Sequence, residues 1–368
     1  MKKKEDVIVF NYMGRHGSGN MHAYVMAKAL IDKGENVVAI VSSYAENIEA
    51  WRKLELTELI EVNTYRNKLE FAFRTIWFYA MKGKSIAAYL GEEYTLMASY
   101  SPMLTYWTYG VNRNLHCKKI ACNHDPIPHS GDRRKLTFEK EYEESDVIIV
   151  HSEKFIEIVK KQYPNKEVVY MPLTRLNVYD LHNKERAVNY SQDKVNFLFF
   201  GTISKYKGLE ILADAYAITK EKCANVSLTV AGNGDFSPYQ EKYEKLKEKD
   251  VVVINRWIKD EEVESFFVGN NVVLVLPYTD ATQSGVALVA MEYGVPIIAT
   301  RTGGLEEQIS EGENGYLVEA RNIEKLAQRM IELAQNPKDI IELKNNMLCM
   351  KEQNSDVKLA EQLLDLIQ

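Results

Sequence analysis

Two successive series of short apolar runs, separated by helix-length segments, constrain the fold of this 368-residue chain most strongly. The first series starts with the run Val7 to Asn11, passes through a glycine-rich loop and a helical pattern, and reaches a second run at Val37 to Val41. A strand, loop, helix and strand in this order form a right-handed βαβ unit, and continuous Val and Ile runs are typical of buried parallel strands. The sequence therefore predicts an α/β fold.

The remaining apolar runs extend both series. The first series continues with predicted strands at Thr95–Tyr100, Lys119–Asn123, Asp146–His151 and Val168–Pro172. The second series comprises predicted strands at Asn196–Phe200, Val226–Ala231, Val251–Asn255, Val272–Leu276 and Pro296–Thr300, with helical patterns between them. The two halves of the chain thus repeat one architecture.

The stretch between Pro172 and Val195 is polar and lacks apolar periodicity, which indicates an interdomain connection. The chain length also favours two domains over one. We therefore predict an N-terminal domain over residues 1–172, a connection over 173–194, a C-terminal domain over 195–350, and a terminal helix over 351–368 that packs back on the first domain.

Composition restricts the class of protein. A net charge of −6 argues against a nucleic-acid-binding surface, and no run of about eighteen apolar residues is present to cross a bilayer. The four cysteines, which form no CxxC pair, predict reduced thiols and a cytoplasmic protein. The start of the chain lacks the apolar region of a secretion signal.

Glycines and hydroxyl groups follow two strands of the second series, in the segments Phe199 to Gly208 and Leu274 to Glu307. Each segment lies just past an apolar run and just before a helix. The first N–H groups of a helix lack intrahelical partners, and the helix dipole favours an anion there. This arrangement suits a diphosphate.

The order of these segments resembles the C-terminal half of family-4 glycosyltransferases, which have the GT-B fold. The resemblance implies two Rossmann-like domains whose parallel sheets face each other across a cleft. It also implies metal-independent transfer of a sugar from a nucleotide-diphosphate donor, with retained configuration and no further cofactor. Uridine donors are expected rather than guanosine donors, because they are commoner in the family.

Lys207 is the expected catalytic cation of the donor site. A departing nucleoside diphosphate gains negative charge, so a fixed cation stabilises the transition state more than the ground state. Lys205 is expected to supply a second charge, because Thr202 stands where the family usually has an arginine. The alternative is that both lysines are solvated surface side chains. The donor-binding residues that the resemblance implies are Gly201, Thr202, Lys205, Gly232, Ile258, Thr282, Gln283, Ser284, Gly285 and Val286.

Simpler interpretations of these donor residues remain open. Gly232 also fits a plain turn, Arg256 beside Ile258 fits a surface residue, and Ser284 fits a helix N-cap without a ligand.

The family's pair of glutamates, spaced Glu-x7-Glu, is missing. Alignment on the glycine at position 294 places Ala281 and Val289 at the two positions, and alignment on Ser284 places Thr282 and Ala290 there. The nearest carboxylates, Asp280 and Glu292, are twelve residues apart and could not both occupy the usual places.

The expected acceptor site lies in the first half of the chain. The resemblance implies acceptor contacts from the loop residues Arg15, His16, Gly17, Ser18 and Gly19. It also makes His124 the histidine beside the reacting sugar; a loop histidine bonded to the backbone is the alternative. A metal site at His124 and His129 is not expected, because their spacing does not place both rings on one helical face and the intervening prolines forbid a helix.

Residues 66–84 interleave aromatic and aliphatic side chains with arginines and lysines. Such a segment fits peripheral contact with an anionic membrane at its inner face, and a helix packed into the N-terminal domain is the alternative.

The sequence thus predicts an enzyme that glycosylates a hydroxyl of a glycan or a lipid-linked glycan precursor. Because the glutamate pair is missing, the main rival is a catalytically weak GT-B partner subunit that binds glycan or stabilises an active transferase. More distant rivals are a sugar-nucleotide epimerase and a phosphorylase.

Overall fold

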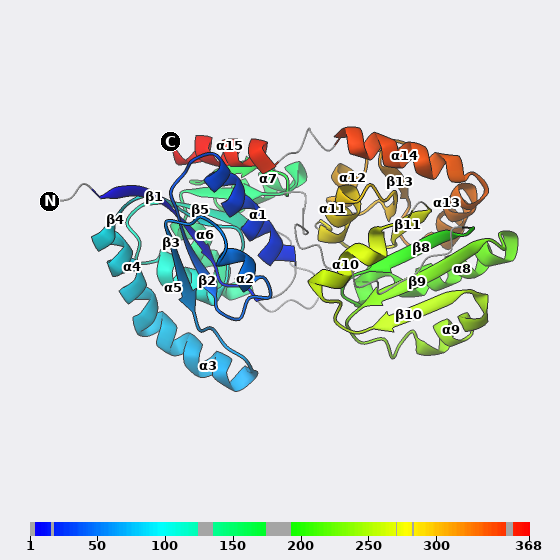
Figure 1. Cartoon of the computed structure of the whole chain (residues 1–368), viewed down its shortest axis with the longest axis horizontal. Helices are drawn as coiled ribbons and strands as arrows, with labels where there is room; N and C mark the ends of the chain where they lie inside the picture. The colour runs from blue at the N-terminus through cyan, green and yellow to red at the C-terminus, as the bar shows by residue number, and fades with distance from the viewer. Residues whose placement is uncertain are drawn as a thin grey trace. The chain divides into compact units, whose positions relative to one another are not determined.

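The computed structural model describes residues 4–15, 18–123, 135–173, 193–269, 271–281, 283–350 and 356–368. The chain divides into two compact units, one made of residues 1–176 together with 354–368 and the other of residues 177–353. Each unit is an α/β structure around one parallel sheet (Figure 1). Within the described ranges, no helix is long and apolar enough to cross a membrane.

The first unit contains a seven-stranded sheet with the order β3-β2-β1-β4-β5-β6-β7. Its strands are β1 (Glu5–Tyr12), β2 (Val37–Ser42), β3 (Glu58–Val62), β4 (Tyr94–Ser101), β5 (Lys118–Asn123), β6 (Val147–Val150) and β7 (Glu167–Tyr170). Its helices are α1 (Ser18–Asp32), α2 (Ile48–Trp51), α3 (Lys68–Trp77), α4 (Gly83–Glu93), α5 (Tyr106–Asn112), α6 (Lys135–Glu144), α7 (Ile156–Gln162) and α15 (Asp356–Ile367). A π-helical turn, η1 (Phe78–Lys82), joins α3 to α4, and a 3-10 turn, η2 (Glu153–Phe155), precedes α7.

The second unit contains a six-stranded sheet with the order β10-β9-β8-β11-β12-β13. Its strands are β8 (Val195–Phe200), β9 (Val226–Gly232), β10 (Val251–Asn255), β11 (Val272–Leu276), β12 (Ile297–Thr300) and β13 (Gly315–Val318). Its helices are α8 (Leu209–Lys222), α9 (Gln240–Glu244), α10 (Asp260–Phe267), α11 (Gly285–Glu292), α12 (Leu305–Gln308), α13 (Ile323–Gln335) and α14 (Pro337–Met350), with 3-10 turns η3 (Lys205–Lys207) and η4 (Lys247–Lys249).

Both sheets reverse their strand order at one point, between β1 and β4 in the first unit and between β8 and β11 in the second. All strand pairs are parallel, for example β11 beside β8 with Leu274 opposite Leu198. In open parallel sheets, ligands bind outside the carboxyl ends of the strands at such a switch point. The topology therefore directs attention to the segments that follow β8 and β11.

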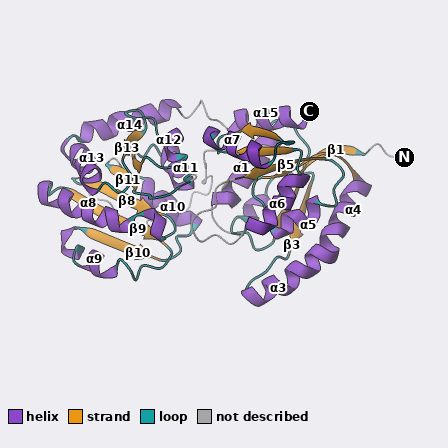
Figure 2. Ribbon diagram, turned by 180° about the vertical axis from the view of Figure 1, so that it is seen from behind, coloured by secondary structure: helices purple, strands orange, loops and turns teal. Residues whose placement is uncertain are grey.

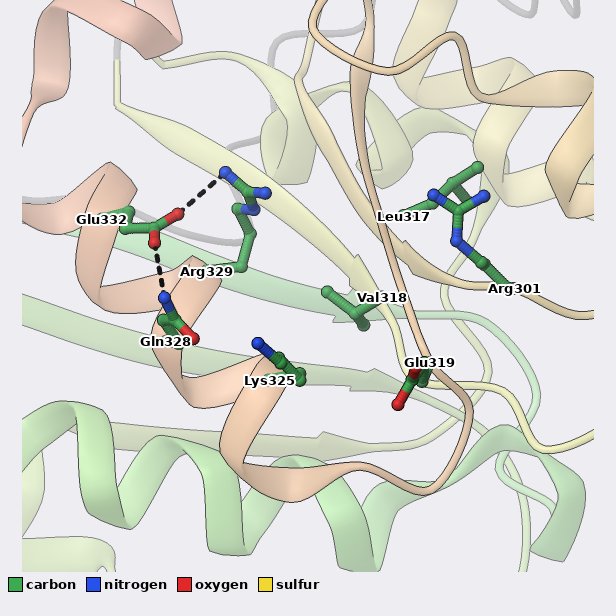
Figure 3. Close-up of a pocket in the computed structure, with 8 residues that line it drawn as sticks. All are labelled: Arg301, Leu317, Val318, Glu319, Lys325, Gln328, Arg329 and Glu332. Carbon is green, nitrogen blue, oxygen red and sulfur yellow. Dashed lines mark hydrogen bonds and ion pairs between the residues drawn. The ribbon is translucent and has the colours of Figure 1, made fainter.

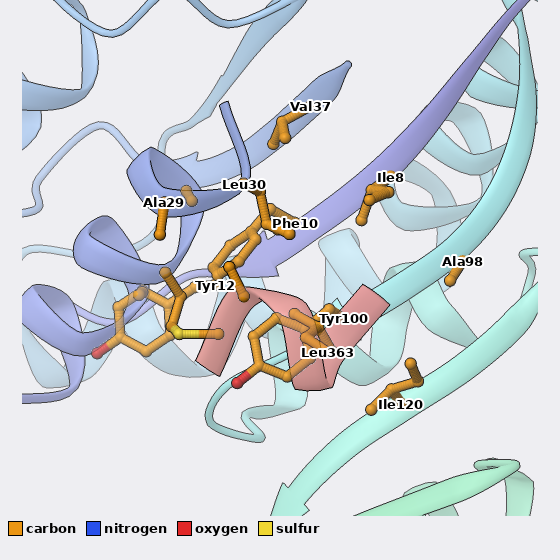
Figure 4. Close-up of a cluster of buried hydrophobic side chains, with 14 of the residues drawn as sticks. Ile8, Phe10, Tyr12, Ala29, Leu30, Val37, Ala98, Tyr100, Ile120 and Leu363 are labelled. Atoms are coloured by element: carbon orange, nitrogen blue, oxygen red, sulfur yellow. The ribbon is translucent and has the colours of Figure 1, made fainter. Parts of the chain in front are cut away.

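Alternate residues of β1 face two different helical layers, which explains its continuous apolar run. Ile8 and Phe10 pack in one core cluster with α1 and α15, whereas Val7 and Val9 pack in a second cluster with α4 and α5. Figure 2 shows helices on both sides of the strands. The last helix belongs to the first core, where Leu363 lies among the side chains of the sheet (Figure 4).

A buried polar network crosses the second of these layers. Asn112 on α5 donates hydrogen bonds to Ser101 and to Glu141 on α6, and it accepts one from Asn11 on β1. Glu141 is 2% exposed. Burial raises the pKa of its carboxyl from 4.5 to about 8, against the hydrogen bond from Asn112, which lowers it. The folded protein therefore holds Glu141 protonated at neutral pH.

A raised carboxyl pKa destabilises the folded state as the pH rises. Between pH 4.5 and about 8 the folded protein binds the proton that the unfolded chain has released, so the unfolding free energy falls by up to about 1.4 kcal/mol per pH unit. We expect Glu141→Gln, which keeps an acceptor for Asn112, to remove this slope. Chemical denaturation at several pH values measures it, and an unchanged slope would assign the pH dependence to other groups.

Candidate donor-anion site

The candidate site lies at the switch point of the second sheet, where the loops after β8 and β11 meet. The loop after β8 forms the turn η3, and Gly208 follows it with φ +71°. A Cβ atom on Gly208 would lie 1.9 Å from the carbonyl oxygen of Pro277, so only glycine fits there. The N–H of Thr279 donates to the carbonyl of Tyr206 at 2.7 Å. Two segments seventy residues apart are thus joined tightly.

This junction positions Lys207. Its ammonium lies 3.6 Å from the ring centroid of Tyr278 and 5.1 Å from that of Tyr206. Tyr278 is fully buried, and its hydroxyl lies 3.3 Å from the hydroxyl of Ser284. The aromatic ring attracts the cation and restricts where it can lie. Within the parts of the chain that the structure describes, no carboxylate forms an ion pair with Lys207.

Ser284 caps α11, and its side chain accepts a hydrogen bond from the N–H of Ala287. The Gln308 side chain forms hydrogen bonds with both backbone polar groups of Ser284. Its Oε1 accepts from the Ser284 N–H at 2.8 Å, and its Nε2 donates to the Ser284 carbonyl at 3.2 Å. The Ser284 N–H is thus already engaged. The N–H groups of Gly285 and Val286, in the first helical turn, have no intrahelical acceptor and are the ones available to an anion.

Two glycines at strand ends pack closely beside this helix. A Cβ atom on Gly201 would lie 3.1 Å from a methyl group of Val286 in α11. A Cβ atom on Gly232, at the end of β9, would lie 1.8 Å from the carbonyl oxygen of Gly201. Gly232 therefore needs glycine because the backbones approach closely, whereas Gly201 favours glycine through its φ of +114°. The structure brings together Gly201, Gly232, Lys207, Ser284, Gly285 and Val286, six of the residues that the sequence predicted.

The local electrostatics of this group favour an anion. The Lys207 ammonium and the N-terminus of α11 are both positive, and a single tyrosine ring, that of Tyr278, separates Lys207 from the capping serine. Two positive groups so close repel each other unless negative charge lies between or beside them. The arrangement can therefore bind and stabilise a diphosphate.

The other predicted donor residues differ in environment. Thr202 and Lys205 are exposed, Gln283 is half-buried, and Thr282 lies outside the described residues. Ile258 is buried after β10.

The neighbouring Arg256 forms a two-pronged ion pair with Glu262, at 2.6 and 2.8 Å. This pairing makes Arg256 a surface structural residue.

The structure offers no glutamate at the positions of the missing pair. Val289 and Ala290 are buried apolar residues on α11, and Ala281 is buried before it. Asp280 is exposed and Glu292 lies at the far end of the helix. A carboxylate that binds the donor sugar or ribose therefore cannot come from these positions.

The predicted acceptor loop is only partly described. Gly19 is buried, and a Cβ atom there would lie 2.8 Å from the Tyr12 hydroxyl, so its role in the fold is to pack on that ring. The Arg15 guanidinium lies 4.2 Å from the ring centroid of Tyr65 and donates to the Tyr65 carbonyl. The predicted residues His16, Gly17 and His124 lie outside the described residues, as does the side chain of Ser18.

Sequence reasoning missed two residues of the donor-anion site, Tyr278 and Gln308. Tyr278 lies at the end of an apolar run, where the sequence pattern predicts only another core residue. Gln308 lies at the end of α12, a helix of four residues, and reaches Ser284 only through the fold. Neither has a signal at fixed sequence spacing.

A separate pocket of about 240 Å³ lies beside β13 and α13 in the second unit (Figure 3). Its two arginines are balanced by carboxylates: Arg329 pairs with Glu332 at 2.8 Å, and Arg301 lies 3.7 Å from Glu311. None of the predicted donor residues lines it; the lining residues are Arg301, Leu317, Val318, Glu319, Lys325, Gln328, Arg329 and Glu332.

The residues described contain no group of three His, Cys, Asp or Glu that could hold a metal ion.

Comparison with known families decides what kind of domain carries the donor-anion site. Residues 194–336 match the family described as Glycosyl transferases group 1. The chain therefore contains a group 1 glycosyl transferase domain. This domain includes every strand of the second sheet and every residue of the donor-anion site described above.

Curated relatives match part of the chain. An uncharacterized 41.2 kDa protein in the cps region of Klebsiella pneumoniae is 32% identical over 142 residues, which cover 38% of this chain and 37% of that protein. A D-inositol 3-phosphate glycosyltransferase of Paenarthrobacter aurescens is 31% identical over 35% of this chain and 33% of its own length. The chain thus spans roughly a third of the length of these relatives. An uncharacterized glycosyltransferase of Haemophilus influenzae is 22% identical over 68% of this chain and 69% of its own.

Solved structures match both units. Sucrose-phosphate synthase from Thermosynechococcus elongatus has a TM-score of 0.71 at 18% identity, covering 99% of this chain and 98% of that chain. Anabaena HepE in complex with UDP and glucose has a TM-score of 0.65 at 14% identity, covering 98% of both chains. The fold is accordingly that of GT-B glycosyltransferases.

Proposed function

We propose that this protein is a glycosyltransferase that moves a sugar from a UDP-sugar to a hydroxyl of a glycan or glycolipid precursor, with retained configuration. The observation that carries the proposal is the convergence of Lys207 with the N-terminus of α11 over Tyr278, inside a group 1 domain. A cation and a helix N-terminus have little reason to meet unless an anion joins them. UDP is preferred because a structure of the same fold, HepE, is described with UDP and glucose.

In the proposed reaction the diphosphate is the leaving group. Lys207 and the N–H groups of Gly285 and Val286 stabilise the charge that develops on it as the bond to the sugar breaks. The acceptor hydroxyl attacks from the same face, and a diphosphate oxygen takes its proton. This route needs no nucleophile from the protein. His124 is proposed to lie beside the reacting sugar.

One observation supports a second candidate, a partner subunit with little catalysis of its own. Neither alignment of the expected glutamate pair finds a glutamate: the first position falls on Ala281 or Thr282, before α11, and the second on the buried Val289 or Ala290 of α11. Such a subunit would use the fold to bind glycan or to stabilise an active transferase.

A thermal-shift screen tests nucleotide binding, which the enzyme requires. A ligand that binds only the folded state stabilises it by about 2.7 kcal/mol at a hundred times its dissociation constant. We expect UDP and at least one UDP-sugar to raise the melting temperature, and the ADP, GDP and TDP series to do so less. No shift with any nucleotide at millimolar concentration would contradict the transferase and favour the partner subunit.

A further inference from the structure

One side of α3 and η1 in the first unit carries large apolar side chains that nothing in the described chain covers. These residues, named here the α3 ridge, are Leu69, Phe73, Ile76, Trp77 and Met81, with exposed fractions between 54% and 77%. Single exposed apolar residues are ordinary, but these five recur at helical spacing along one stripe. A contiguous stripe of this kind marks an interaction surface.

The opposite side of the same helix is firmly packed. The Phe71 ring lies 4.8 Å from Tyr65, and the Phe78 ring lies 4.6 Å from Trp107, measured between ring centroids. At the start of α4, a Cβ atom on Gly83 would lie 2.2 Å from the carbonyl oxygen of Gly110, so the two backbones touch. The interpretation of this segment as a packed helix is therefore correct for one face only.

The π-helical turn η1 keeps this orientation through the junction of α3 and α4. Phe78 and Gly83 are five residues apart, and both are buried on the packed face. In a regular α-helix the residue four positions after Phe78, Lys82, would lie on that face instead. The extra residue per turn rephases the helix, so the packed face continues into α4 and the ridge stays outward. Figures 1 and 2 both show α3 extending beyond the edge of the sheet.

The charge of this segment is opposite to that of the protein. Residues 66–84 contain five basic residues and one acidic residue, a net charge of +4, whereas the whole chain carries −6. Arg74 lies 3.7 Å from Glu70, the single acidic residue. Lys82 and Lys84 are exposed, and among the described residues neither forms an ion pair. Two exposed cations therefore lie at the C-terminal end of the apolar stripe.

We propose that the α3 ridge docks on the surface of an anionic lipid bilayer. Its apolar side chains enter the boundary between headgroups and acyl chains, and Lys82 and Lys84 contact anionic headgroups. A second copy of this chain fits the ridge less well, because pairing two ridges would bring two segments of charge +4 together. The inference rests on the first unit alone and holds whether or not the protein is a transferase.

Vesicle flotation without nucleotide tests the proposal. The full chain is mixed with vesicles of equal parts phosphatidylglycerol and phosphatidylcholine, or of phosphatidylcholine alone, at low and high salt. We expect binding to the anionic vesicles, weakened by salt. The double variant Lys82→Gln/Lys84→Gln should lower the partition coefficient by roughly 30-fold, since each basic residue near the surface contributes about fivefold and the two factors multiply.

Matched variants separate the ridge from general surface effects. Phe73→Ser/Ile76→Ser should lower vesicle binding about tenfold or more, because it removes two of the apolar groups that enter the bilayer. Ile341→Ser on α14, an exposed apolar residue of the second unit, should leave binding unchanged. Equal losses from both changes would overturn the assignment of the surface to α3. Circular dichroism verifies that each variant is folded.

Trp77 supplies an independent readout. Trp51 and Trp107 are buried, so a Trp257→Phe background leaves Trp77 as the exposed tryptophan. Its fluorescence should move to shorter wavelength with anionic vesicles and stay unchanged with neutral ones. No shift, or an equal shift with neutral vesicles, would overturn the proposal. A dimer in vesicle-free solution would also overturn the proposal if Phe73→Ser/Ile76→Ser dissociated it, because the α3 ridge would then bind a second copy of the chain.

Discussion

Replacing Lys207 with methionine is expected to lower turnover by about 10²- to 10³-fold, the usual effect of removing one group that stabilises developing charge in a transition state. Methionine keeps an aliphatic stem over Tyr278 and removes only the charge, so the fold should survive. The measurement is release of UDP from the UDP-sugar that the thermal-shift screen identifies. Binding of the intact donor should weaken less than turnover falls, because the charge on the diphosphate grows as the bond breaks.

The control for this variant is Lys245→Met. Lys245 is an exposed lysine beside α9 that pairs with Glu241, away from the donor-anion site. It should leave turnover and melting temperature unchanged. Equal turnover in the wild type and in Lys207→Met would remove Lys207 from catalysis. If UDP also shifted neither protein, the partner-subunit alternative would replace the transferase.

Replacing Gly208 with alanine is expected to destabilise the second unit by about 3 kcal/mol or more, because a strained backbone and a steric clash add together. The residue has φ +71°, and its new Cβ atom would lie 1.9 Å from the Pro277 carbonyl oxygen. For a unit of this size the melting temperature should fall by roughly 6–12 °C. Since the clash pushes the Lys207 turn away from Tyr278, UDP should bind more weakly as well.

Gly312→Ala isolates the clash from the backbone strain. Gly312 belongs to the same unit and has φ +77°, but a Cβ atom there would meet nothing within 4 Å. Its replacement should destabilise by only about 1–2 kcal/mol, the effect of a left-handed conformation alone. Equal destabilisation by the two variants would show that the loops after β8 and β11 separate easily, and the close junction would then not position Lys207.

The fold was largely predictable from the chain, because buried parallel strands are continuous apolar runs. The runs starting at Val7 and Asn196 proved to be the central strands β1 and β8. Two edge strands were missed. β3 carries two glutamates and is only half-buried, and β13 has four residues, so neither shows a continuous apolar run.

The sequence by itself determined which segments are candidates for binding an anion, since glycines, hydroxyl groups and lysines after apolar runs are local features. It could not determine that Lys207 lies on the ring of Tyr278 or that Gln308 holds Ser284, because those contacts join positions far apart in the chain. Only the parallel sheet, with β11 beside β8, brings them to one edge. The outward direction of the α3 ridge was likewise decided by tertiary packing: periodicity marks an apolar stripe, but burial of Phe78 against Trp107 selects which stripe faces solvent.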